Sequence, residues 1–161
     1  LIKFAKITGV KPTLLDAVED VNTKQLEEII FIAKRKLGVL ESKRITILGT
    51  SFKPNTDDIR DSIAIELIKK LLKRKAKIMI HDPKAIENTK EIFKNKIDYA
   101  KSIQDAILNS QCVIIMTQWG QYEKLTNSDF KKMKKKIVID TRRILEDKKL
   151  DVDYYAIGIG N

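Results

Sequence analysis

The chain has 161 residues, 43% of them apolar, a single cysteine and a formal net charge of +10 at pH 7. This length and composition favour one α/β domain with a helical appendage over a disordered chain. No apolar run approaches membrane-spanning length, and a single cysteine excludes an internal disulfide framework, so we expect a cytoplasmic protein with no membrane partner.

A long amphipathic helix is predicted ahead of the first strand. Residues 1–9 resemble the end of a helix that breaks at Gly9, and Pro12 suits the first turn of the next helix. From Leu14 to Leu37 apolar residues recur every three or four positions, and Gly38 supplies a stop. The apolar face is wider than the flank of one domain requires. It could lie on its own sheet or form an interface with a second chain.

Strands and helices alternate along the rest of the chain. Continuously apolar runs, such as 78–80 and 113–116, are typical of strands that are covered on both faces. The alternation predicts an α/β fold with a doubly wound, parallel, Rossmann-like sheet and right-handed crossovers. The expected strands are 44–49, 77–81, 97–100, 112–117, 137–140 and 154–158, and the expected helices are 62–75, 84–93, 102–110 and helical turns across 121–133. We divide the chain into a helical segment, 1–38, and a sheet domain, 39–161.

The loop after the first strand is rich in charged and hydroxyl side chains. Within residues 50–61 it holds one lysine, one arginine, three aspartates and three hydroxyls. Open α/β sheets bind ligands in the crevice beyond the carboxyl ends of their strands, so Lys53 and Arg60 could hold phosphates there. Alternatively, Lys53 is a solvated loop residue and Arg60 pairs with one of the nearby aspartates.

Other polar residues receive structural interpretations. Asp61 and Ser62 suit the cap of the following helix, and Asp82 reads as a turn residue because no glycine-rich dinucleotide-binding turn precedes it. His81 is the single histidine and has no second histidine or cysteine near it, so we expect no metal site. Cys112 opens an apolar strand and is expected to be a buried, unreactive thiol.

The positive charge has two interpretations. The run 131–136 is densely basic and could mark a nucleic-acid-binding domain. No aromatic residue that could stack on a base interleaves with it, and the other basic residues are spread along the chain. We therefore favour a solvated surface and expect no nucleic-acid partner.

Four motifs, in order, resemble the C-terminal domain of UDP-glucose dehydrogenases in the nucleotide-sugar dehydrogenase family. They are FKPNTDDIRDS (52–62), HDP (81–83), VIIMTQWGQYEKL (113–125) and IVIDTRRIL (137–145). Residues 13–37 resemble the end of the family's long central helix. The resemblance implies an NAD-dependent enzyme that oxidises UDP-glucose twice at C6 to UDP-glucuronate. It also implies a homodimer through this helix, which we favour because packing of two copies would bury the wide apolar face.

The resemblance also implies roles for individual residues. Phe52, Lys53 and Arg142 would contact the UDP-sugar, and Arg60 would contact the pyrophosphate of NAD. Arg143 could replace Arg142 as the contact. Trp119 could line the uridine pocket, but we favour a place in the core, because large aromatic side chains mostly pack.

The family's nucleophilic cysteine and its NAD-binding domain have no counterpart in these 161 residues. We therefore expect a fragment that supplies no catalytic residue and is inactive alone, with NAD held mainly by another domain. UDP-N-acetylmannosamine and GDP-mannose are alternative substrates. A stand-alone nucleotide-sugar-binding module is a rival function.

Overall fold

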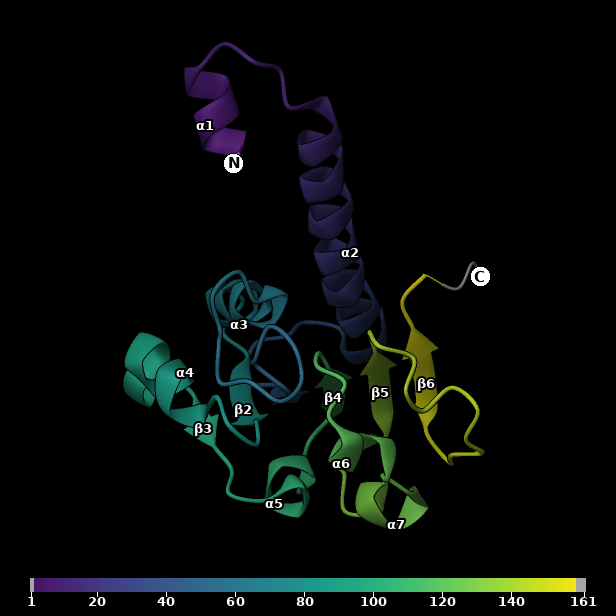
Figure 1. Ribbon diagram of the computed structural model, residues 1–161. Coiled ribbons are helices and arrows are strands. Elements are labelled where there is room, and N and C mark those ends of the chain that lie inside the picture. Colours follow the sequence, from purple (N-terminus) through teal and green to yellow (C-terminus); the bar gives the residue numbers. More distant parts are fainter. Residues whose placement is uncertain (1, 159–161) are drawn as a thin grey trace.

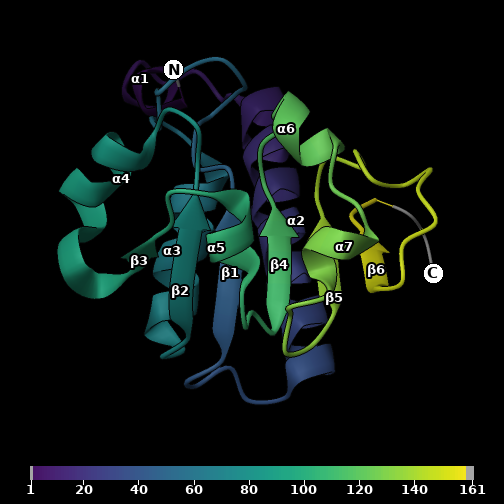
Figure 2. The ribbon, with the colours of Figure 1, turned by 90° about the horizontal axis from the view of Figure 1, so that it is seen from below.

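A parallel sheet forms the centre of the molecule (Figures 1 and 2). The computed structural model describes residues 2–158, except the side chains of Ile2, Lys3 and Lys6. Within this part of the chain six strands lie in the order β3-β2-β1-β4-β5-β6, and every neighbouring pair is parallel. The strands are β1 (Arg44–Leu48), β2 (Lys77–His81), β3 (Asp98–Tyr99), β4 (Cys112–Ile115), β5 (Ile137–Asp140) and β6 (Asp153–Ala156). The predicted doubly wound sheet is confirmed, and its strand order reverses between β1 and β4.

Helices cover both faces of the sheet. In Figure 2, α2 (Thr13–Leu37) and α3 (Ile63–Lys73) lie behind the strands, whereas α5 (Ile103–Ile107) and α7 (Asn127–Phe130) lie in front. Two further helices are α4 (Ile86–Phe93), which precedes the short η1 (Lys94–Lys96) near β3, and α6 (Gly120–Glu123). Two apolar clusters follow from this layering, one on each face. The strands read as continuously apolar because both of their faces are buried; every residue of β4 and β5 is buried.

The long helix α2 has two different halves. Its C-terminal half packs on the sheet domain and buries Leu26, Ile29, Ile30, Ile32, Ala33 and Leu37. Its N-terminal half extends beyond the domain, with α1 (Ile2–Ile7) at the far end (Figure 1). There Leu14, Val18 and Val21 are 78%, 50% and 53% exposed. The apolar face therefore covers the domain's own sheet only along the second half of the helix. The predicted interface with a second chain would involve the first half. The division at residue 38 stays a prediction.

Several predicted boundaries move for local reasons. The first strand ends at Leu48 rather than at residue 49, because Gly49 turns to φ +92°. The helical turns predicted across 121–133 are two helices, since Thr126 and Asp129 form a capping box that starts α7. The helix predicted across 1–9 is described as α1, while residue 1 lies outside the described residues. No described helix has the length and hydropathy needed to span a membrane.

Candidate functional site

The charged loop, residues 49–62, follows β1 at the carboxyl edge of the sheet and leads into α3. Because β1 and β4 are neighbours at the reversal of strand order, this loop lies beside the residues that follow β4. In doubly wound sheets the crevice at this reversal is where ligands bind. The candidate site is therefore built from the loops that follow β1, β4 and β5.

Gly49 allows the loop to approach the end of β4 closely. A Cβ atom added at Gly49 would lie 2.5 Å from Cβ and 2.8 Å from the backbone nitrogen of Thr117, and its φ of +92° also disfavours other residues. Thr117 in turn donates its hydroxyl hydrogen to the carbonyl oxygen of Ser51, at 2.7 Å. The first residues of the loop are thus packed directly against the residues that follow β4.

Asp82, at the end of β2, anchors the same loop residues. Its Oδ2 accepts the backbone N–H groups of Thr50 at 2.7 Å and of Ser51 at 3.0 Å, and the Ser51 hydroxyl at 3.1 Å. Oδ1 accepts the N–H groups of Lys84 and Ala85, at 2.9 and 2.8 Å. Asp82 does shape the turn before α4, as expected, but the sequence interpretation missed that this 3% exposed carboxylate binds the charged loop. The position of Asp82 at the end of the second predicted strand, on the same edge as the charged loop, was the feature of the sequence that could have indicated this contact.

The tip of the loop is closed on itself and carries two cations. Phe52 donates its N–H to the carbonyl of Asp58 at 2.8 Å, and its side chain is 55% exposed. Arg60 places Nε 3.0 Å from Oδ1 and Nη2 2.7 Å from Oδ2 of Asp58. These bonds to Arg60, aided by the charge of Lys53, lower the pKa of Asp58 to about 2. Of the aspartate partners considered for Arg60, Asp58 is the one that forms an ion pair.

The residues after β5 separate the two arginines of the IVIDTRRIL motif. Arg142 donates its backbone N–H to buried Asp140, and its Nε lies 2.7 Å from the carbonyl oxygen of Met116 at the end of β4. Arg143 has φ +58° and forms a two-pronged ion pair with Glu146, at 2.7 and 2.8 Å. Arg142 therefore lies over the residues that follow β4, while the guanidinium of Arg143 is occupied elsewhere.

The predicted binding residues lie in loops at the carboxyl edge of the sheet, and contacts between these loops link them. Lys53 and Arg60 both act on the charge of Asp58. Arg142 contacts Met116, the residue before Thr117, which holds Ser51 next to Phe52. Ser62 is the N-cap residue of α3, as expected, but neither its side chain nor that of Asp61, which is left-handed at φ +56°, makes a capping hydrogen bond.

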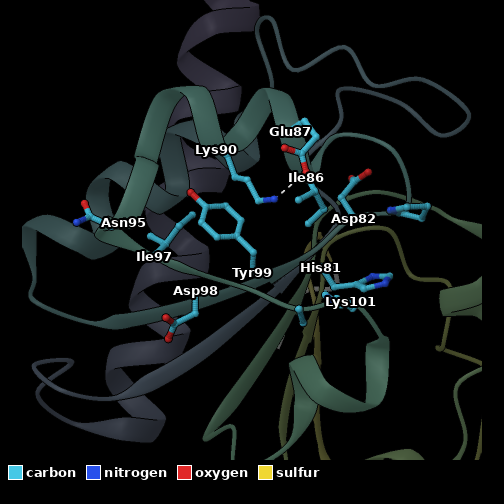
Figure 3. Close-up of a pocket in the computed structure, with 12 residues that line it drawn as sticks. His81, Asp82, Ile86, Glu87, Lys90, Asn95, Ile97, Asp98, Tyr99 and Lys101 are labelled. Atoms are coloured by element: carbon cyan, nitrogen blue, oxygen red, sulfur yellow. Dashed lines mark hydrogen bonds and ion pairs between the residues drawn. The ribbon is translucent and has the colours of Figure 1, made fainter.

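A hollow of about 740 Å³ lies on the β3 side of β2 and is lined by residues of β2, α4 and β3 (Figure 3). Lys90 and Tyr99 lie beside each other in it, and Lys90 is paired with Glu87 at 2.7 Å. His81 also lines it, and its Nδ1 is 2.9 Å from the hydroxyl of buried Tyr122. Burial lowers the pKa of His81, and the charge of Asp82 opposes this shift. The hollow contains none of the residues predicted to bind ligand.

The single cysteine and the single tryptophan are both buried. Cys112 is fully buried in β4, and burial raises its pKa, as expected for an unreactive thiol. Trp119 is 6% exposed and belongs to the core cluster, which agrees with the favoured structural role. Within residues 2–158 no cluster of His, Cys, Asp and Glu could hold a metal ion.

NAD would not fit this domain in the way that dinucleotide-binding domains hold it. Such domains have a glycine-rich turn after the first strand and a free acidic residue after the second. Here the turn has only Gly49, and both oxygens of Asp82 are occupied by the chain itself. The side chain of Arg60, in the loop after β1, is 86% exposed.

Comparison with known proteins gives a consistent result. Residues 46–147 match the model of the UDP-glucose/GDP-mannose dehydrogenase family, UDP binding domain. The chain is 40% identical to UDP-glucose 6-dehydrogenase AglM of Haloferax volcanii over 157 residues, which are 98% of this chain and 36% of that protein. It is 31% identical to UDP-glucose 6-dehydrogenase YwqF of Bacillus subtilis over 149 residues, 90% of this chain and 34% of that protein. The chain thus spans about a third of the length of each of these two curated relatives.

Solved structures show the same relationship. A UDP-glucose dehydrogenase from Pyrobaculum islandicum superposes with a TM-score of 0.82 at 30% identity, over 96% of this chain and 34% of that one. The UDP-N-acetyl-mannosamine dehydrogenase Cap5O of Staphylococcus aureus shares the fold, with a TM-score of 0.73 at 22% identity, over 90% of this chain and 33% of that one.

Proposed function

The chain belongs to the UDP-glucose/GDP-mannose dehydrogenase family, and we propose that it is the UDP-sugar-binding part of an NAD-dependent UDP-glucose 6-dehydrogenase. The reaction proposed for the whole enzyme converts UDP-glucose to UDP-glucuronate by two successive oxidations at C6. Relatives of that name, matched along nearly the whole chain, support this substrate over UDP-N-acetylmannosamine and GDP-mannose.

Three residues of the chain are proposed to hold the substrate. Arg142 carries the proposal, because its Nε is held by Met116 at the reversal of strand order and its terminal nitrogens have no protein partner among the described residues. A guanidinium fixed in this way can present two N–H groups to a diphosphate. Lys53 would add a second cation from the neighbouring loop, and exposed Phe52 would pack beside the ligand.

Arg60 is proposed to touch the pyrophosphate of NAD. Its pairing with Asp58 uses Nε and Nη2, so it holds the guanidinium in place before the ligand arrives and leaves Nη1, which has no partner among the described residues, for a single contact with the pyrophosphate. NAD supplies the hydride acceptor of the reaction when it is bound, and the rest of its site would be supplied by another domain. The chain contributes recognition of charge and no catalytic group, so we propose that it is inactive alone.

The helical segment 1–38 is proposed to join two copies into a homodimer, with the sheet domain, 39–161, carrying the UDP-sugar. The exposed apolar residues on the N-terminal half of α2 support this role. A cytoplasmic location belongs to the same proposal.

An assay of the protein expressed from its complete reading frame tests the function. We expect UDP-glucose with NAD to give two NADH per sugar, read from absorbance, and UDP-glucose to exceed UDP-N-acetylmannosamine and GDP-mannose in kcat/KM. Substitution Lys53→Ala should lower kcat/KM for UDP-glucose, whereas Lys132→Ala, on an exposed lysine outside the site, should not. Absence of NADH formation with all three sugars would refute the proposal.

A further inference from the structure

Asp82 occupies a position that a dinucleotide-binding domain uses for its ligand. In that class of fold, an acidic residue at the end of the second strand accepts the ribose hydroxyls. Here the acidic residue is present, but it is buried and faces donors of its own chain. A buried carboxylate needs such donors, because leaving it without partners costs several kcal/mol.

The donors to Oδ2 of Asp82 come mainly from the loop that carries the proposed ligand contacts, whereas Oδ1 accepts from Lys84 and Ala85. Oδ2 collects the N–H groups of Thr50 and Ser51 and the Ser51 hydroxyl, and the indole Nε1 of Trp119 lies 3.3 Å away. Thr50 and Ser51 directly precede Phe52 and Lys53. The bonds span more than thirty residues of sequence, with separations of 32 and 31.

Two further contacts complete the clamp on these residues. Thr89 in α4 gives its hydroxyl hydrogen to the carbonyl of Ala85, so at the 2.9 Å contact Thr50 donates and Thr89 accepts. Thr117 holds the carbonyl of Ser51 from the β4 side. Asp82 is the one of these partners that is charged and contacts both residues, and hydrogen bonds to a charged acceptor are roughly twice as strong as neutral ones.

We propose that Asp82 is a positioning residue of the UDP-sugar site, which holds Thr50 and Ser51 so that Phe52 and Lys53 face the ligand. This inference rests on the proposed function. The carboxylate that would otherwise recognise a ribose recognises the protein's own loop. In this domain the carboxylate therefore stabilises the loop that is proposed to bind phosphate, and it does not bind the ribose of a dinucleotide.

Removal of the carboxylate gives the central test, in the protein expressed from its complete reading frame. We expect Asp82→Ala to weaken UDP binding, measured by calorimetry, by about 10- to 100-fold, the usual cost of losing a residue that orients a ligand contact. Asp82→Asn keeps one carbonyl oxygen and should rescue part of this loss. Hydrogen exchange should become faster at the amides of Thr50 and Ser51, while residues 45–48 of β1 stay protected.

A matched control separates positioning from general stability. Thr46→Val removes a buried hydrogen bond, from Thr46 Oγ1 to the Ala106 carbonyl at 2.6 Å, without touching the loop. It should lower the unfolding midpoint but leave UDP affinity and the exchange of Thr50 and Ser51 unchanged at a temperature where all variants are folded.

Failure of the positioning role of Asp82 and failure of the proposed function would give different results in these experiments. If the wild-type protein binds no UDP, the proposed function fails and the inference with it. If the wild type binds UDP and folded Asp82→Ala binds within twofold of it, with unchanged loop exchange, only the inference is overturned. Should Asp82→Ala not fold, Asp82→Asn decides: wild-type affinity and exchange in that variant would overturn the inference, and intermediate values would support it.

Discussion

Arg142 and Arg143 are adjacent in sequence, but their guanidinium groups have different partners. Arg142 is held by one backbone carbonyl through Nε, whereas Arg143 uses Nε and Nη2 on Glu146. Only Arg142 can offer both terminal nitrogens to a diphosphate without breaking an ion pair. This difference favours Arg142 as the ligand contact.

We therefore predict that Arg142→Ala weakens UDP binding by about 10- to 100-fold, since a hydrogen bond to a charged group contributes about 1.5–3 kcal/mol. Arg143→Ala is the matched control and should change the affinity less than about twofold, because its exposed ion pair contributes little. Calorimetric titration of both variants checks this. A larger loss in Arg143→Ala than in Arg142→Ala would reverse the assignment.

Gly49 adopts a backbone conformation that would cost any residue with a Cβ atom conformational energy. An added methyl group would overlap Thr117, and φ +92° is strained for residues with a Cβ. We predict that Gly49→Ala lowers the free energy of unfolding by about 2–5 kcal/mol, from strain and overpacking together. Gly120→Ala, where an added Cβ meets nothing within 4 Å, should change it by less than about 1 kcal/mol. Urea unfolding measures both.

His81 should make stability depend on pH. Burial lowers its pKa below 6.5 in the folded state, so the unfolded chain takes up the proton first as the pH falls. Folding stability should therefore decrease as the pH drops through 6.5, until the folded state is also protonated. His81→Asn keeps a donor for Tyr122 but does not titrate, so its unfolding midpoint should fall less between pH 7 and pH 5. Identical pH profiles for variant and wild type would contradict this.

At the scale of elements, the two halves of α2 have different surroundings. Its second half is part of the core, and its first half exposes Leu14, Val18 and Val21 at helical spacing on one face. A second copy that packs on this face would remove the apolar surface from water.

We predict that the double substitution Val18→Glu with Val21→Glu weakens dimerisation by about 30-fold or more, the effect expected at a central interface position. Glu19→Lys, a charge reversal at an exposed position on the side of the helix that faces the domain, is the control and should dimerise normally. Light scattering behind size-exclusion chromatography gives the masses. A dimer that survives the double substitution would argue against this interface.

At the scale of the whole molecule, the sheet separates two charged edges. Basic residues collect at the amino ends of the strands, where Lys134 and Lys135 donate their N–H groups to Ser110, just before β4. The proposed site lies at the carboxyl ends. A strand of 5 residues, as in β1, spans about 15 Å. That distance exceeds the Debye length of about 8 Å at physiological salt.

We predict that Lys134→Glu with Lys135→Glu leaves UDP affinity within about twofold at physiological salt, because screening decouples the edges. Lys53→Glu should greatly reduce it. Titration at low salt should reveal a larger effect of the double substitution. Strong loss of UDP binding at physiological salt would instead place part of the site at the basic edge.

The fold and the site differ in how much of them could be predicted from the sequence. The strands and the parallel, doubly wound class of the sheet could be predicted from local patterns, since runs such as 113–116 can be buried only where helices cover both faces. The charged loop, too, could be placed at the carboxyl edge, because it follows the first strand directly.

The sequence alone determined the family, the layered sheet and the position of the loop with Lys53 and Arg60. Each of these can be recognised from the order of residues within short segments of the chain. Only the tertiary structure decided that Asp82 binds the loop, that Arg143 rather than Arg142 is paired with Glu146, and that half of α2 is covered. These properties depend on groups that meet across long stretches of chain, and a local pattern carries no information about which partner a side chain will meet.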